Sequence, residues 1–128
     1  MLRIMVVDDE ELAAIRLSRL VAECGEPSET VMFLDPLKAY EYAKTHRIDI
    51  AFLDISMPGM NGLQLSQLLT DIHQSIEIVF VTGTDAYAVR AFELNAIDYI
   101  MKPVTAKRLG ATMKRIGTGS SPKRQEET

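Results

Sequence analysis

Five polar residues stand where apolar runs of the chain end, and their types suit metal and phosphate chemistry. Asp8 and Asp9 follow LRIMVV, Asp54 follows IAFL, Thr82 follows IEIVFV, and Lys102 follows IDYIM. Such runs, apolar almost throughout and rich in β-branched residues, are typical of strands buried on both faces of a parallel sheet. Because the carboxyl ends of parallel strands lie along one edge, where ligands bind, we expect three carboxylates, a hydroxyl and an ammonium to converge there.

The paired acids Asp8 and Asp9, together with Asp54, predict a Mg²⁺ site at this edge. A single aspartate at a strand end can cap the following helix, but two acids followed by Glu10 and Glu11 exceed what capping requires. Carboxylates gathered in a partly desolvated crevice would repel one another unless a cation lay between them. A few oxygen ligands favour Mg²⁺, which keeps several waters and often bridges to phosphate, whereas Ca²⁺ takes more protein oxygens.

Asp54, within AFLDISMPGMNG, is the candidate nucleophile. As a structural residue it would only cap a turn, but its place at a strand end favours a carboxylate that accepts a phosphoryl group. A metal beside it would neutralise charge on the phosphoryl oxygens. A lysine after a strand is usually solvated, but Lys102 ends an apolar run and would add a point positive charge there. The Thr82 hydroxyl could donate to one phosphoryl oxygen.

Five predicted strands alternate with helical patterns along the chain. The strands are expected at about 2–7, 29–34, 49–53, 77–82 and 97–101. Repeats of strand then helix imply an α/β fold with a parallel sheet and helices on both faces. For five strands the favoured arrangement is flavodoxin-like and doubly wound, with strand order 2-1-3-4-5 and a switch point between strands 1 and 3. Those two strands end in aspartates, so topology and residue types independently select the same crevice.

Capping signals and apolar spacing predict five helices that flank this sheet. Asp35, Asn61 and Thr105 are expected to open helices, while Gly25 follows the end of the helix at about 10–24, and Asn95 can end a helix in the left-handed conformation. The residues expected to face inward are Leu12, Ile15, Leu17, Leu20 and Val21, then Leu37, Tyr40 and Ala43, then Leu65, Leu68, Leu69 and Ile72, then Ala88, Val89 and Phe92, and finally Leu109, Met113 and Ile116.

Composition limits the class of protein. The 128 residues, 47% apolar and 25% charged, are ordinary for one globular domain, which we expect over residues 1–116. A formal net charge of −4 argues against non-specific binding of nucleic acid. Without a signal peptide or a bilayer-length apolar run, and with Cys24 as the single cysteine, we expect a cytoplasmic protein with no membrane segment. Residues 117–128, GTGSSPKRQEET, predict a flexible tail or a linker to an output domain absent from this chain.

Taken together and in order, VVDDEE, FLDISMPGMNGLQL, VFVTGTDAYA and DYIMKPV make residues 2–116 resemble the receiver domain of two-component response regulators. The resemblance implies that a sensor histidine kinase phosphorylates Asp54. It also implies that Asp9 and Asp54 bind Mg²⁺ directly, together with the carbonyl of Ser56, and that Asp8 acts through water.

The same resemblance implies how the phosphorylated state is recognised. Thr82 and Tyr99 match a switch pair, although an aromatic residue in a strand is on its own more often a core residue. Lys102 and Pro103 match a lysine that precedes a usually cis proline bond.

The stretch VTGTDAYAVRAFELNAIDYIMKPV is more similar to receivers of the LytTR type than to others. Those receivers carry a DNA-binding domain, so contact with DNA is expected only through a domain absent from this chain. Activation is expected to switch the surface formed by the helix at about 85–94, the strand at 97–101 and the helix that Thr105 caps. That surface would form a homodimer and control an output such as transcription.

Two other functions remain open on the residues alone. A phosphatase of the haloacid dehalogenase type also uses an aspartate nucleophile and Mg²⁺, but its nucleophile lies on the first strand in a DxD pattern, whereas this chain has Asp8-Asp9-Glu10 and no cap insertion. A degenerate receiver would act as an interaction module independent of phosphorylation, although every expected site residue is present. We therefore expect a phosphoacceptor that catalyses only its own phosphorylation and dephosphorylation, and not an enzyme with turnover.

Overall fold

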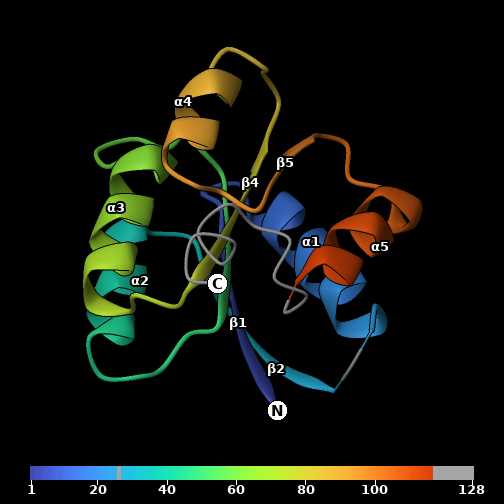
Figure 1. Cartoon of the computed structure of the whole chain (residues 1–128), viewed down its shortest axis with the longest axis horizontal. Helices are drawn as coiled ribbons and strands as arrows, with labels where there is room; N and C mark the ends of the chain where they lie inside the picture. Colours follow the sequence, from blue (N-terminus) through green and yellow to red (C-terminus); the bar gives the residue numbers. More distant parts are fainter. Residues whose placement is uncertain (26, 117–128) are drawn as a thin grey trace, which may run out of the picture.

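The computed structural model describes residues 1–25 and 27–116, which form a five-stranded parallel sheet with helices on both faces (Figure 1). The strands lie in the order β2-β1-β3-β4-β5, so the predicted flavodoxin-like topology is confirmed. The strands are β1 (Leu2–Val7), β2 (Ser28–Phe33), β3 (Ile50–Leu53), β4 (Glu77–Thr82) and β5 (Asp98–Met101). Because each neighbouring pair is parallel, all carboxyl ends lie at one edge.

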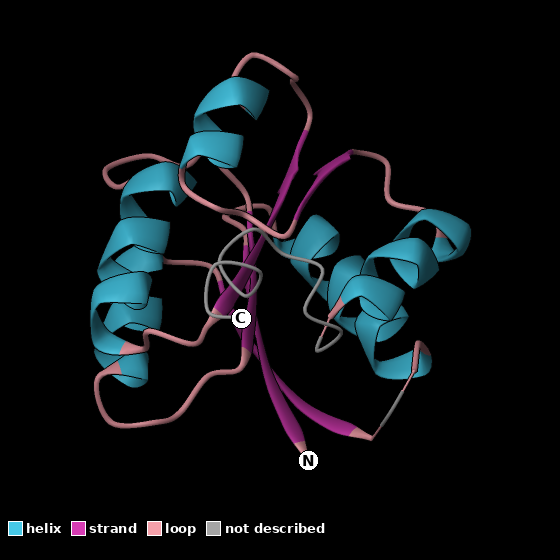
Figure 2. Cartoon of the chain, viewed as in Figure 1, coloured by secondary structure: helices cyan, strands magenta, loops and turns pink. Residues whose placement is uncertain are grey.

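The helices divide into two layers that sandwich the sheet (Figure 2). They are α1 (Glu11–Glu23), α2 (Pro36–Ala43), α3 (Gly62–Ile72), α4 (Ala88–Glu93) and α5 (Ala106–Arg115). Helices α1 and α5 cover one face, while α2, α3 and α4 lie on the other side.

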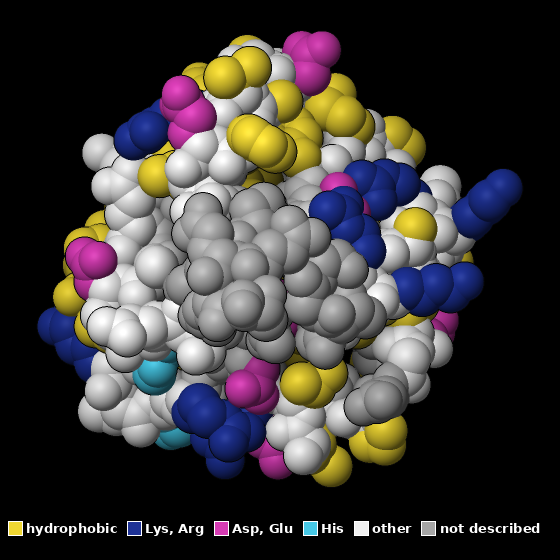
Figure 3. Space-filling model, viewed as in Figure 1, with side chains coloured by type: hydrophobic (Ala, Val, Ile, Leu, Met, Phe, Trp, Pro, Cys, Tyr) yellow, Lys and Arg dark blue, Asp and Glu magenta, His cyan; other side chains and the backbone are white. Residues whose placement is uncertain are grey.

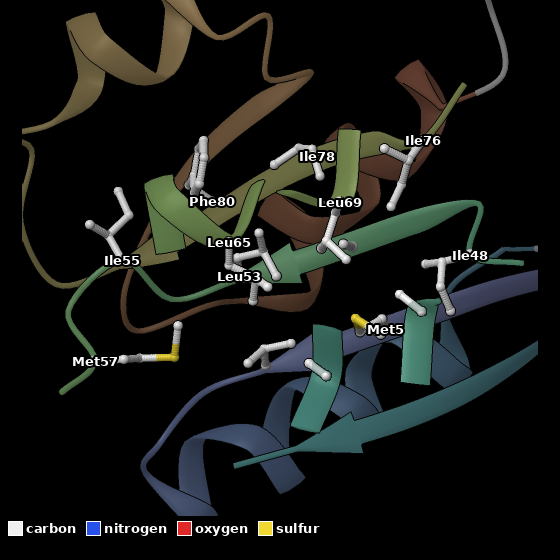
Figure 4. Close-up of a cluster of buried hydrophobic side chains, with 14 of the residues drawn as sticks. Met5, Ile48, Leu53, Ile55, Met57, Leu65, Leu69, Ile76, Ile78 and Phe80 are labelled. Atoms are coloured by element: carbon white, nitrogen blue, oxygen red, sulfur yellow. The ribbon is translucent and has the colours of Figure 1, made fainter. Parts of the chain in front are cut away.

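Two apolar clusters hold these layers to the sheet, because successive strand residues point to opposite faces. In β1, Met5 and Val7 face α2 and α3, whereas Ile4 and Val6 face α1 and α5. Figure 4 shows the first cluster, in which Leu65 of α3 lies against the sheet. Each β1 side chain from Ile4 to Val7 is at most 1% exposed. Full burial of one such side chain contributes about 1.5–3 kcal/mol, so the strand that leads to the candidate site is held firmly.

The predicted helix boundaries are confirmed where side chains cap the backbone. Asp35 accepts a hydrogen bond from the second helical N–H of α2, Thr105 accepts one from the third helical N–H of α5, and Asn61 forms a reciprocal capping box at α3. Gly25, after α1, and Asn95, after α4, adopt positive φ angles of 84° and 63°. These caps fix where each helix begins relative to the strand edge.

Some residues expected to face inward are exposed, so those predictions are wrong. The exposed fractions are 82% for Leu12, 54% for Leu37, 37% for Ile72, 76% for Val89 and 72% for Phe92. These side chains are exposed because of their angular position around the helix axis. Leu12 and Val89 each lie two residues, or about 200°, from the buried alanine that marks the inward face of their helix. The rotation of each helix about its axis therefore turns part of its apolar sequence to solvent.

Within residues 1–25 and 27–116, none of the helices has the length and apolarity required to cross a bilayer. The tail predicted at residues 117–128 lies outside the described residues.

Candidate functional site

The candidate residues lie at the carboxyl ends of four neighbouring strands, β1, β3, β4 and β5. Asp8 follows β1, Asp54 follows β3, Thr82 ends β4 and Lys102 follows β5. Backbone hydrogen bonds continue past the strand ends, from Asp54 N–H to Val7 O at 2.9 Å and from Lys102 N–H to Thr82 O at 2.9 Å. Hydrogen bonds to the neighbouring strand therefore fix the main chain at Asp54 and Lys102.

Lys102 joins the two buried aspartates, as the strand-end argument predicted. Its Nζ lies 2.8 Å from Asp8 Oδ2 and 3.2 Å from Asp54 Oδ2, and 3.9 Å from Glu10 Oε1. The side chains of Asp8 and Asp54 are 4% and 6% exposed. A single ammonium thus bridges two nearly buried carboxylates, and its charge lies directly beside the Asp54 carboxylate.

Asp9 completes a cluster of carboxylates. One oxygen from each of Asp8, Asp9 and Asp54 lies within 4.8 Å of the others. Asp9 is exposed, so the cluster opens to solvent on its side. Asp54 also accepts the backbone N–H of the exposed Ser56, at 3.3 Å from Oδ1. A set of three hard oxygen donors with one open side fits Mg²⁺, which binds through a few carboxylates and keeps several waters.

Electrostatics make Asp54 more basic than an exposed aspartate. Burial raises the pKa of the Asp54 carboxyl, the charge of Lys102 opposes this, and the charge of Asp8 adds to the rise, with a net pKa above the ordinary value. Burial lowers the pKa of Lys102, but the hydrogen bond and charge of Asp8 and the charge of Asp54 outweigh it and raise the pKa overall. The lysine therefore stays an ammonium, and the aspartate keeps a nucleophilic oxygen.

The hydroxyl of Thr82 is buried without a hydrogen-bond partner among the described residues. The residue is 1% exposed and sits at the end of β4, on the same edge as the acids. A buried hydroxyl that lacks a partner costs about 1–3 kcal/mol, and this donor is available to a ligand oxygen at the edge.

Tyr99 connects the site edge to the loop that follows Thr82. Its Oη donates to the carbonyl of Thr84 at 2.5 Å, and its ring is tilted against Phe80 with centroids 6.5 Å apart. Burial raises the pKa of the Tyr99 hydroxyl, which remains a donor. The pair expected from the resemblance, Thr82 and Tyr99, is thus linked through two residues of main chain.

Gly62 positions Asp54, and sequence reasoning missed this role. A Cβ on Gly62 would lie 2.2 Å from Asp54 O and 2.9 Å from Ile55 Cα, and the Gly62 N–H donates to Ile55 O at 3.0 Å. The dipeptide Asn61-Gly62 signalled only a helix start, because a close approach between backbones leaves no trace in local sequence.

An apolar cavity of about 320 Å³ lies beside the site. It is lined by Asp8, Ala13, Arg16, Leu17, Val81, Lys102, Pro103 and Val104. Arg16 Nη2 donates to the carbonyl of Val104 at 3.1 Å, which ties α1 to the loop after β5. The Lys102-Pro103 peptide bond is cis, the geometry that the resemblance implied.

Comparison with known proteins identifies the family of this chain. The family model described as "Response regulator receiver domain" matches residues 4–114. An "Uncharacterized response regulatory protein" of Vibrio cholerae is 38% identical over 116 residues, which cover 91% of this chain and 48% of that protein. The "Transcriptional regulatory protein NatR" of Bacillus subtilis is 39% identical over 116 residues, covering 90% of this chain and 49% of the relative. The chain therefore spans about half the length of the curated relatives it matches.

Solved structures show the same fold. The response regulatory domain of protein mrkE from Klebsiella pneumoniae superposes with a TM-score of 0.83 at 34% identity, covering 91% of this chain and 96% of that one. A receiver domain protein (CheY-like) from Methanospirillum hungatei, at 21% identity, matches with a TM-score of 0.81 over 100% of this chain and 99% of that one, and indicates the fold alone.

Proposed function

The chain belongs to the response regulator receiver domain family of signalling proteins, and we propose that it accepts a phosphoryl group on Asp54 from a phosphohistidine of a sensor kinase. One observation carries the proposal. The buried Asp54 carboxylate lies 3.2 Å from the ammonium of Lys102 and shares a cluster of oxygens with Asp8 and Asp9. That arrangement combines a nucleophile, a fixed cation and a metal-binding donor set.

In the proposed step a carboxylate oxygen of Asp54 attacks phosphorus, forming a P–O bond while the P–N bond to the donor histidine breaks. The electron pair of that bond returns to the imidazole, whose other nitrogen carries the proton, so that the ring leaves neutral. Lys102 keeps its proton and stabilises charge on a phosphoryl oxygen. Mg²⁺, bound by Asp9 and Asp54 with the Ser56 carbonyl and through water by Asp8, would neutralise charge on the transferred group.

The cavity beside Lys102 supports a protein donor. Its largely apolar wall can accept an apolar side chain of a docked partner, and Leu12, 82% exposed on α1, lies one helical turn from Arg16 at its rim. Leu12→Asp should therefore slow transfer from a histidine kinase and leave transfer from acetyl phosphate unchanged. Equal rates with the kinase for both proteins would remove this part of the proposal.

After phosphorylation, Thr82 would donate to the new phosphoryl group and Tyr99 would respond through the loop between them. The surface to be switched is α4, β5 and α5. Figure 3 shows apolar side chains gathered over α4, and Val89, Phe92 and Met101 are 76%, 72% and 44% exposed. Exposed apolar side chains that cluster in this way support an interface, here with a second copy of the chain in a homodimer.

The remaining expectations belong to the longer protein. Since the relatives extend well beyond the matched segment, we infer an output domain of DNA-binding type after residues 117–128, in a cytoplasmic regulator of transcription. The similarity of residues 81–104 to receivers of the LytTR type supports this inference.

Intact mass after incubation with acetyl phosphate and Mg²⁺ tests the central proposal. We expect the wild-type chain to gain one phosphoryl group and Asp54→Asn to gain none. EDTA and Asp9→Asn should slow the gain strongly, because both remove the proposed metal. Equal modification of the wild type and Asp54→Asn would contradict the assignment.

A further inference from the structure

Asp98 is a nearly buried carboxylate, remote from the acidic site, that accepts hydrogen bonds from α5. Its side chain is 9% exposed. Arg108 binds it in a bidentate manner, with Nη2 to Oδ1 and Nη1 to Oδ2 both at 2.8 Å. Thr112 Oγ1 donates to Oδ2 at 2.6 Å, and Arg115 Nη1 lies 3.5 Å from Oδ1. Burial raises the pKa of Asp98, but the bonds from Arg108, Thr112 and its neighbour's N–H outweigh it and lower the pKa overall, so the group is an anion.

Arg108 also holds the main chain of Tyr99. Its Nη2 donates to the Tyr99 carbonyl at 3.1 Å, and its Nη1 donates to Thr112 Oγ1 at 3.0 Å. A guanidinium fork that serves Asp98 and Tyr99 together permits one orientation, because its donors lie in one plane. Apolar contacts of α5, such as that of the fully buried Leu109, tolerate small sliding, whereas these bonds do not.

Tyr99 is therefore held at both ends. Its carbonyl is bonded to α5 through Arg108, and its hydroxyl is bonded to the Thr84 carbonyl in the loop after Thr82. Any displacement of that loop acts on the Tyr99 ring, and the ring is part of a residue whose backbone is fixed to α5. The contacts thus form a continuous path from the loop after β4 to the side of α5 that faces β5.

We propose that Asp98, Arg108 and Thr112, which we name the α5 latch, couple the phosphorylation site to α5, with Asp98 as a positioning residue for Tyr99. The inference rests on the proposed function of Asp54, since it concerns how phosphorylation there is transmitted. With the latch intact, motion of the Thr84 loop shifts α5 on the sheet. Without it, Tyr99 moves alone and α5 keeps its unphosphorylated position.

Contacts that only stabilise the fold would behave differently from contacts that couple two sites. Removing purely stabilising contacts lowers stability but leaves the response of α5 to phosphorylation intact. Removing the α5 latch abolishes that response while Asp54 is still phosphorylated. The two therefore separate when stability, phosphorylation and the response of α5 are measured on the same variants.

The test compares Asp98→Asn and Thr112→Val with wild type, using acetyl phosphate and Mg²⁺. Intact mass reports phosphorylation, and backbone amide chemical shifts of α5 report its response. We expect all three proteins to be phosphorylated alike, with the phosphorylation-induced shifts of α5 reduced by half or more in both variants. Thr112→Ser keeps the hydroxyl donor and should show the wild-type shifts of α5. Arg108→Lys loses the two-pronged guanidinium and should show the reduced shifts.

Met113→Ala is the matched control, because Met113 packs in the cluster beneath α5 and makes none of the latch contacts. It should lower the unfolding midpoint and retain the full shifts. Wild-type shifts in Asp98→Asn, or an equal loss in Met113→Ala, would overturn the latch. A wild-type chain that takes up no phosphoryl group would instead refute the proposed function of Asp54, and the latch with it.

Discussion

Gly62→Ala tests how closely α3 must approach the phosphoacceptor. The Cβ of the new residue would lie 2.2 Å from Asp54 O, 2.8 Å from Asp54 C and 2.9 Å from Ile55 Cα, whereas ordinary contact begins at 3.4 Å. All three neighbours are backbone atoms, so no rotamer change can relieve the overlap. The difference between 3.4 Å and 2.2 Å requires a relative movement of α3 and the Asp54 backbone of about 1 Å.

The substitution should affect both the free energy of unfolding and the rate of autophosphorylation. Overpacking of this kind costs about 1–3 kcal/mol. Alanine gains at most about 1 kcal/mol in helix propensity, and less at the first helical position. We therefore expect the free energy of unfolding to fall by about 2 kcal/mol. A displacement of about 1 Å at a reacting group slows a reaction on the order of 10²-fold, so autophosphorylation should suffer more than stability does.

Urea unfolding and the rate of mass gain with acetyl phosphate measure both effects. Gly110→Ala is the control, since it lies inside α5 with no atom within 4 Å of the new Cβ. It should raise stability by about 0.5–1 kcal/mol and leave the rate unchanged. If Gly62→Ala unfolded and reacted as the wild type does, the argument that this glycine sets the position of Asp54 would be wrong.

Three further changes probe charge and capping. Lys102→Met leaves two buried carboxylates without their cation, so in EDTA the free energy of unfolding should fall by about 1–3 kcal/mol, the cost of buried groups that lack a partner, and Mg²⁺ should restore part of it by binding the folded state; an equal deficit with and without Mg²⁺ would count against a metal at this cluster. The pKa of Asp98 is lowered on folding from its ordinary 3.8, so its contribution is fully present above that value and decreases as the pH falls from there toward the pKa of the folded state. Asp98→Asn should therefore lower the free energy of unfolding by about 2 kcal/mol at neutral pH and by progressively less as the pH falls below 3.8, and a deficit independent of pH would contradict the ionised bond. Asn61→Ala should cost about 1 kcal/mol in urea unfolding by removing the capping box of α3, while Asn61→Ser should cost little.

The strand edge was predictable because it depends on local patterns and one rule of topology. Continuous apolar runs located β1 and β3, and parallel winding requires their ends to meet. The convergence of Asp8, Asp54 and Lys102 follows from chain order alone and is present in the structure.

Features that depend on how a helix is rotated against the sheet, or on contacts between residues far apart in the sequence, were not predictable. Val89 and Phe92 have helical spacing, but only the orientation of the short α4 decides that they face solvent. The bond between Asp98 and Arg108 joins a strand to a later helix, and each residue taken alone reads as a solvated charge. The Gly62 contact with Asp54 is likewise invisible until both backbones are placed.

The balance of charge suggests which side chain must respond first to phosphorylation. Three clustered carboxylates against one ammonium leave two negative charges in excess, which a divalent ion would cancel. Conversion of the Asp54 carboxylate to an aspartyl phosphate replaces one negative charge by about two, so an excess returns. Lys102 already contacts Asp8 and Asp54, so it can stabilise charge on a phosphoryl oxygen from its present position. Among the described residues, Thr82 carries a buried hydroxyl with no partner at this edge, so the new charge should recruit Thr82 before Lys102 moves. The response would then begin at the end of β4 and reach Tyr99 through the loop that holds its hydroxyl.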